Sequence, residues 1–112
     1  MHELSLCRSI SSIVTRVADG RRVAVVEIDV GRLRQVVPST LARCWDVLTP
    51  GTPLQGSRLA IRVVPAVLRC PQCGADTTLA DLPVMKCAAC GCRAVSIVSG
   101  EEFAVTALQL ED

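Results

Sequence analysis

Apolar side chains near the amino end recur at helical spacing. Between residues 3 and 18 they fall at every third or fourth position, and most of the positions between them are serine or arginine. That period places the apolar side chains on one face of a helix. Asp19-Gly20 should end this helix, because glycine readily adopts the left-handed conformation. We therefore expect an amphipathic helix whose buried stripe comprises Leu6, Ile10, Ile13, Val14 and Val17.

A second helical pattern lies in the middle of the chain. Pro38 is well suited to a first helical position, where its missing N–H has no helical partner in any case, and Pro50-Gly51 should halt the helix. The apolar positions between these limits recur at spacings of three and four residues. They predict a core face made of Leu41, Cys44, Trp45 and Leu48.

Three other segments are rich in β-branched residues or alternate with a period of two. In residues 22–30 the second half alternates apolar with acidic side chains, and residues 58–63 alternate apolar side chains with arginine or alanine. Pro65 marks the end of the second segment, and residues 101–110 follow a Ser-Gly pair. Alternation of this kind is typical of strands that have one face in water. We expect three strands.

The order of these elements predicts an α+β fold. We expect two helices on a small three-stranded sheet, formed by residues 1–66 and 99–112, with a cysteine-rich module inserted at residues 67–98. A chain of 112 residues suffices for one small core and an appended module that needs its own cross-link.

The module contains two knuckles of one form, Cys-Pro-Gln-Cys-Gly and Cys-Ala-Ala-Cys-Gly, and residues 74–86 between the pairs are enough for a short hairpin. A two-residue gap lets both sulfurs of a pair face one centre. Four thiolates at tetrahedral corners suit zinc, and they leave no coordination position for a reactive water. The sequence therefore predicts a structural zinc-ribbon site with the ligands Cys70, Cys73, Cys87 and Cys90.

A disulfide scaffold or a redox site accounts for the cysteines less well than a metal does. Seven cysteines could indicate a secreted disulfide scaffold, but the number is odd and four of them form Cys-x-x-Cys pairs. A single such pair beside a βαβ pattern would suggest thioredoxin chemistry, whereas two pairs with trailing glycines do not. Cys7 and Cys44 lie by the apolar helix faces and are expected to be packing residues. Cys92 is a possible substitute ligand, but a spectator thiol is the simpler interpretation.

Composition excludes several functional classes. Hydrophobic residues make up 50% of the chain and charged residues 21%, which is typical of a folded globular protein. A net charge of +1, with only Trp45 and Phe103 as aromatic residues, argues against nucleic acid or an anionic membrane as partner. No apolar run reaches the roughly 20 residues of a membrane span, so we expect a cytoplasmic protein. The sequence shows no nucleophile paired with a base, so we do not expect an enzyme.

The only histidine is His2. A lone terminal histidine is usually solvated, yet this position has its own chemistry. Methionine is normally retained before a bulky residue, so the amine of Met1, the main-chain nitrogen of His2 and its imidazole can close a chelate that the nitrogen of Glu3 completes. In-plane nitrogen donors of this kind suit square-planar nickel(II) or copper(II). The amino end is thus a second candidate metal site.

Together these segments resemble the HypA/HybF hydrogenase-maturation proteins, which are small nickel metallochaperones. The resemblance spans essentially the whole chain. It rests on the opening MHELSL, on VEIDVGRL with the following Val-Pro, on the knuckles CPQCG and CAACG, and on IVSGEEF before the last strand.

The resemblance implies a nickel carrier rather than an enzyme, with an α+β nickel domain and an inserted zinc-ribbon domain. It implies that His2 is the essential nickel ligand, that Met1 and Glu3 contribute main-chain nitrogens, and that the knuckle cysteines hold zinc. The expected partners are a nickel-binding maturation GTPase of the HypB type and the large-subunit precursor of [NiFe] hydrogenase, and some relatives also serve urease.

Two departures from the family pattern have consequences. Relatives often carry an acidic residue where this chain has Val37, so a further carboxylate ligand is in doubt. The chain also lacks the histidines that can flank the knuckles, so we expect the zinc site to respond less to mild acid. The alternative function is a zinc-ribbon protein-interaction module without nickel transfer.

Overall fold

The structure is a computed structural model that describes residues 2–80 and 84–111, with only the backbone of His2. The chain divides into two compact units, one of Met1–Asp29, Val36–Arg62 and Phe103–Asp112, the other of Val30–Gln35 and Val63–Glu102. The second unit thus extends a few residues beyond the 67–98 expected for the inserted module and also takes in residues 30–35.

Two helices belong to the first unit. Helix α1 spans His2–Ala18, and it is followed by two residues with positive φ, Asp19 and Gly20. Helix α2 spans Pro38–Leu48 with proline in its first turn, as expected. None of the helices in the described part of the chain is long and apolar enough to cross a membrane.

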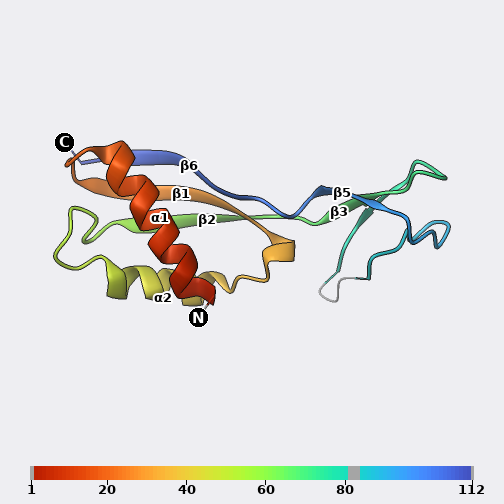
Figure 1. Ribbon diagram of the computed structural model, residues 1–112, viewed down its shortest axis with the longest axis horizontal. Coiled ribbons are helices and arrows are strands. Elements are labelled where there is room, and N and C mark those ends of the chain that lie inside the picture. Colours follow the sequence, from red (N-terminus) through yellow and green to blue (C-terminus); the bar gives the residue numbers. More distant parts are fainter. Residues whose placement is uncertain (1, 81–83, 112) are drawn as a thin grey trace. The chain divides into compact units, whose positions relative to one another are not determined.

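The sheet of this unit has three strands, β1 (Val23–Gly31), β2 (Arg58–Val64) and β6 (Phe103–Leu110), in the order β2-β1-β6 (Figure 1). Main-chain hydrogen bonds join residue 31 to residue 102 and residue 111 to residue 22, so β1 and β6 run antiparallel. The expected α+β arrangement of two helices and a three-stranded sheet is confirmed.

The buried face of α1 differs from the expected stripe. Ile10 and Val14 are buried as expected, but Ile13 is 39% exposed and Val17 is 67% exposed. The other buried residues of the helix are Cys7 and Ala18. The small side chain of Cys7 allows α2 to approach closely, since its sulfur lies 3.3 Å from the carbonyl oxygen of Leu41. The periodicity was compatible with two overlapping stripes, and packing against α2 selects the one with smaller side chains.

The second unit has its own sheet of β3 (Val67–Arg69), β4 (Asp76–Thr78) and β5 (Ser96–Ser99), with β3 in the centre and both pairs antiparallel. Strand β4 pairs back onto β3, so the first knuckle forms the turn of a hairpin. The hairpin expected between the knuckles is therefore not seen among the described residues of 74–86. A small core of Ala66, Leu68 and Leu79 is completed by Val95 and by Leu33 of the short helix η1 (Arg32–Arg34).

Candidate metal centre

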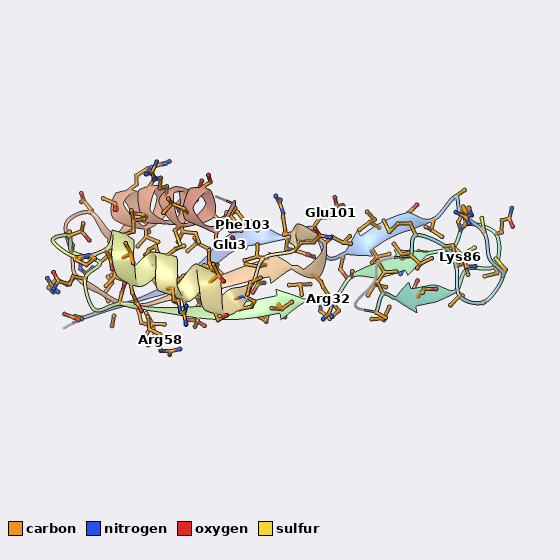
Figure 2. The ribbon with its side chains drawn as sticks, turned by 90° about the horizontal axis from the view of Figure 1, so that it is seen from below. Glu3, Arg32, Arg58, Lys86, Glu101 and Phe103 are labelled. Carbon is orange, nitrogen blue, oxygen red and sulfur yellow. The ribbon has the colours of Figure 1, made fainter. Side chains whose placement is uncertain are left out.

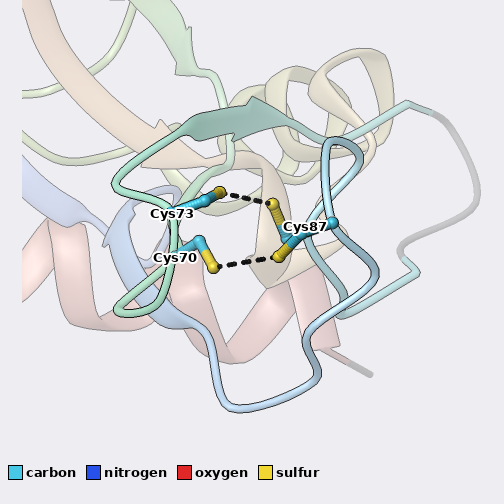
Figure 3. A group of neighbouring side chains, drawn as sticks. Cys70, Cys73 and Cys87 are labelled. Carbon is cyan, nitrogen blue, oxygen red and sulfur yellow. Dashed lines mark hydrogen bonds between the residues drawn. The ribbon is translucent and has the colours of Figure 1, made fainter.

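The four knuckle cysteines come together in the second unit. Their sulfur atoms all lie within 4.8 Å of one another, and no other group of His, Cys, Asp or Glu among the described residues is arranged to hold a metal. The sulfurs of Cys70 and Cys90 are 3.5 Å apart, and those of Cys73 and Cys87 are 3.6 Å apart (Figure 3). Tetrahedral zinc thiolates, with Zn–S bonds of about 2.3 Å, have sulfurs about 3.8 Å apart. The arrangement fits a four-thiolate metal site.

Each knuckle builds its half of the site with the same main-chain hydrogen bonds. The amide of Gly74 donates to the carbonyl of Cys70 at 3.0 Å, and the amide of Gly91 donates to that of Cys87 at 2.9 Å. The amide of each first cysteine in turn donates to a carbonyl just beyond the glycine, at 3.0 and 2.9 Å. Both glycines have positive φ, 75° and 79°, a conformation that other residues rarely adopt. The repeated sequence therefore produces a repeated structure.

Main-chain amides also prepare the first cysteine of each pair to bind metal. The pKa of Cys70 falls to about 6, mainly because the Cys73 amide donates a hydrogen bond to its sulfur. The pKa of Cys87 is lowered for the same reason, with the Cys90 amide as the main donor. A lowered pKa favours the thiolate, which is the form that binds metal.

The second cysteine of each pair holds its proton more firmly in the metal-free group. Hydrogen bonds from main-chain amides at Ala75 and Cys92 act to lower the pKa of Cys73 and Cys90 respectively. Hydrogen bonds with the neighbouring cysteine sulfurs outweigh them, so that the pKa of Cys73 is raised and the pKa of Cys90 rises to about 12. Metal binding must therefore displace at least the protons that Cys73 and Cys90 retain near neutral pH.

Contacts around the sulfurs hold the knuckles in register. The Ala88 amide of the second knuckle donates to the Thr77 hydroxyl of β4 at 3.1 Å. Arg69 and Asp76 face each other across the β3–β4 hairpin with two hydrogen bonds of 3.0 and 3.2 Å. The sulfur of Cys92 lies outside the four-sulfur group, although its carbonyl accepts the hydrogen bond from the Cys87 amide.

The other buried thiol is a packing residue, as expected. Cys7 is fully buried between α1 and α2, and its sulfur donates to the Leu41 carbonyl. The pKa of Cys7 rises to about 11, mainly because burial disfavours the thiolate. A thiol held in this form is a poor nucleophile and a poor metal ligand.

Of the expected nickel ligands, Met1 and the side chain of His2 lie outside the described residues. Helix α1 begins at His2, which corrects the expectation that the helix begins after it. Glu3 lies between α1 and α2 (Figure 2), and its carboxylate accepts a hydrogen bond of 3.4 Å from the Val37 amide at the start of α2. The first N–H groups of a helix have no acceptor within it, so the helix does not engage the main-chain nitrogens of residues 2 and 3.

A family of known proteins matches nearly the whole chain. The family described as "Hydrogenase/urease nickel incorporation, metallochaperone, hypA" matches residues 1–110. Hydrogenase maturation factor HypA of Geotalea uraniireducens is 40% identical over 99% of this chain and 100% of the relative. That of Nostoc sp. PCC 7120 is 33% identical over 100% of this chain and 97% of the relative.

A solved structure shares the fold. The solution structure of the Ni metallochaperone HypA from Helicobacter pylori covers 98% of this chain and 97% of its own, with a TM-score of 0.68 and 19% sequence identity.

Proposed function

The chain belongs to the HypA family of hydrogenase and urease nickel-incorporation metallochaperones, and from that premise we propose that it binds Ni(II) at its amino end and delivers it to the large-subunit precursor of [NiFe] hydrogenase. Nickel is then the cargo of a carrier, and the protein performs no reaction on it. The observation that carries this proposal is the family match over residues 1–110, which takes in the Met-His-Glu start.

We propose that nickel is held by the amine of Met1, the main-chain nitrogen and imidazole of His2, and the main-chain nitrogen of Glu3. The free N–H groups of the first helical turn support this ligand set, because no helical hydrogen bond has to be broken to reach them. The Glu3 carboxylate already accepts a hydrogen bond from α2. It is therefore better placed to hold the amino end against α2 than to act as a ligand.

The four knuckle cysteines are proposed to hold zinc with a structural role. Four sulfurs within 4.8 Å of one another would fill all four positions of a tetrahedral ion, so zinc would stabilise the unit and would have no position for a reactive water. The apolar cluster of the second unit is small: among the described residues its buried members are Ala66, Leu68 and Leu79. Such a core is too small to stabilise the unit alone, and metal binding would supply the difference.

The proposed partners are a HypB-type nickel-binding GTPase, from which nickel would be received, and the hydrogenase precursor, with urease maturation proteins as further clients. A carrier between two proteins needs a labile cargo site and a stable frame, and the two candidate sites divide in this way. The alternative is a zinc-ribbon interaction module that transfers no nickel.

A calorimetric nickel titration of untagged, zinc-loaded protein tests the proposal. We expect specific nickel binding in the wild type and in Ser5→Ala, a control that changes an exposed residue of the same helix. We expect its loss in His2→Ala, with unchanged zinc content and unchanged circular dichroism. His2→Ala should also abolish hydrogenase maturation in cells. Equal nickel affinity in the two variants would contradict the proposed site and favour the interaction module.

A further inference from the structure

The sheet of the first unit has helices on one face. Figure 2 shows α1 and α2 on the same side of the strands, with the Arg58 side chain pointing away from them. Among the described residues of this unit, no helix covers the other face. A wide hollow of about 640 Å³ lies there, over strands β1, β2 and β6. We call this surface the open face, and the side chains that define it are those of Glu27, Asp29, Arg58, Ala60, Arg62 and Thr106.

Strands β1 and β2, which carry most of the open face, run parallel. At one end the Val23 amide donates to the Pro53 carbonyl at 3.3 Å, and near the other end Arg62 bonds to Asp29, so residue numbers rise together along the two strands. Parallel strands are usually covered on both faces. The bare face of this pair is therefore a candidate surface for a layer that another protein supplies.

The open face carries one satisfied ion pair and two charges without partners. Arg62 donates two hydrogen bonds of 2.9 and 2.7 Å to Asp29, and they lower the pKa of the Asp29 carboxyl. The carboxylate of Glu27 and the guanidinium of Arg58 make no hydrogen bond or ion pair with any described residue. Because Asp29 lies beside Arg62, the parallel register makes these two side chains diagonal neighbours on adjacent strands.

We propose that the open face binds a helix of a partner protein that carries an acidic and a basic residue one turn apart. The acidic residue would pair with Arg58 and the basic residue with Glu27. Residues one turn apart on a helix have Cβ atoms about 5–6 Å apart, and diagonal neighbours in a sheet lie about 7–8 Å apart, so the long side chains can meet in pairs. Ala60, a small residue between the two arginines of β2, leaves room for the helix to approach the sheet.

The shape and the charge of the open face favour this occupant over others. The floor of the hollow is the sheet itself, so the site is open rather than enclosed, which suits a protein segment better than a small molecule. Charges of both signs line it, so a segment of one sign only would meet a like charge. The choice of partners for a test rests on the proposed function, which names a nickel-binding GTPase and the hydrogenase precursor.

Calorimetric titration of the zinc-loaded protein with each of these two partners tests the proposal. Arg58→Glu reverses a charge of the open face, whereas Arg43→Glu makes the same change at an exposed residue of α2. With one of the partners we expect Arg58→Glu to bind at least about tenfold more weakly and Arg43→Glu to bind as the wild type does. The wild-type affinity should fall as salt rises from about 0.05 to 0.5 M.

A charge swap separates specific pairing from an effect of net charge. Glu27→Arg combined with Arg58→Glu keeps the net charge at +1 but exchanges the two signs, so we expect it to bind no better than Arg58→Glu alone. Arg58→Ala, a milder change, should also weaken binding and keeps the test decisive if Arg58→Glu misfolds.

Nickel and zinc titrations keep a failure of docking apart from a failure of the nickel site. All open-face variants should bind both metals as the wild type does, whereas His2→Ala should dock normally without nickel. A wild type that binds neither partner, an Arg58→Glu protein that binds both as Arg43→Glu does, or a charge swap that restores the wild-type affinity would each overturn the proposal.

Discussion

Replacing Gly31 by alanine should destabilise the protein strongly, because the added methyl group would clash with the main chain at Gly100 and Glu101. Gly31 has an ordinary φ of −69°, so alanine costs nothing in backbone conformation. A Cβ atom there would lie 2.0 Å from the carbonyl oxygen of Gly100 and 2.5 Å from the amide nitrogen of Glu101. These are backbone atoms, which cannot rotate away as a side chain can.

The size of the effect follows from what must move. Carbon and oxygen atoms in contact lie about 3.3 Å apart or more. The main-chain segments around Gly31 and Gly100 must therefore separate by more than about 1 Å. That movement disrupts the hydrogen bonds from Gly31 to Glu102 at 2.7 Å and from Leu33 to Gly100 at 2.8 Å. Two lost hydrogen bonds at about 1 kcal/mol each, with an overpacking cost of about 1–3 kcal/mol, give about 3–5 kcal/mol.

Urea denaturation of zinc-loaded protein, followed by tryptophan fluorescence and circular dichroism, measures this loss. Gly91→Ala is a useful comparison, because a Cβ there meets nothing within 4 Å and the cost arises only from its φ of 79°. We expect that variant to lose only about 1–2 kcal/mol. A Gly31→Ala protein as stable as the wild type, or no less stable than Gly91→Ala, would refute the steric argument.

Three further predictions concern the metal sites. Adding one residue before Met1 should weaken nickel binding and make the nickel affinity depend more steeply on pH, since the amine becomes an amide that binds only after losing its proton. Calorimetry of untagged and extended protein checks this, and equal affinities would exclude the Met1 amine as a ligand. Cys87→Ser should abolish zinc retention and unfold the second unit, because structural zinc supplies about 10–16 kcal/mol of binding free energy to the folded state. Metal analysis and amide NMR test this, and native dispersion of the amide signals without zinc would contradict it. Zinc binding at pH 7 should release at least about two protons, those of Cys73 and Cys90, and zinc affinity should fall further with acidity as the Cys70 thiolate, whose pKa is about 6, becomes protonated. Calorimetry in buffers of different ionisation enthalpy counts the protons, and zero release would be inconsistent with the two raised thiol pKa values.

Local signals in the sequence located most of the elements. Pro38 marks the start of α2, Asp19-Gly20 follow the end of α1, and alternation places the strands of the first sheet within two residues of their limits. The last strand begins later than expected, at Phe103. There the Glu102 carboxylate accepts a hydrogen bond from the Gly100 amide at 2.7 Å and fixes a turn before the strand.

What the sequence could not supply depends on contacts between distant segments. The buried stripe of α1 is decided by how closely α2 approaches at Cys7, and a helical period cannot distinguish this from the stripe through Val17. The contact of Gly31 with Gly100 has no local signature, because neither glycine marks the ends of an expected helix. The four-cysteine group was foreseeable because two local repeats each fix two sulfurs, and only their meeting required the fold.

The two candidate metal sites differ in how far the fold prepares them. Hydrogen bonds within each knuckle fix one pair of sulfurs, so zinc would join two pairs that are each already arranged. At the amino end, α1 is already helical from His2, and the positive end of a helix dipole disfavours a cation. On the proposed ligand set, nickel must displace amide protons and draw residues 2 and 3 out of helical geometry. Part of the binding free energy is spent on that change and is recovered when nickel leaves, so the first turn of α1 would favour release to an acceptor.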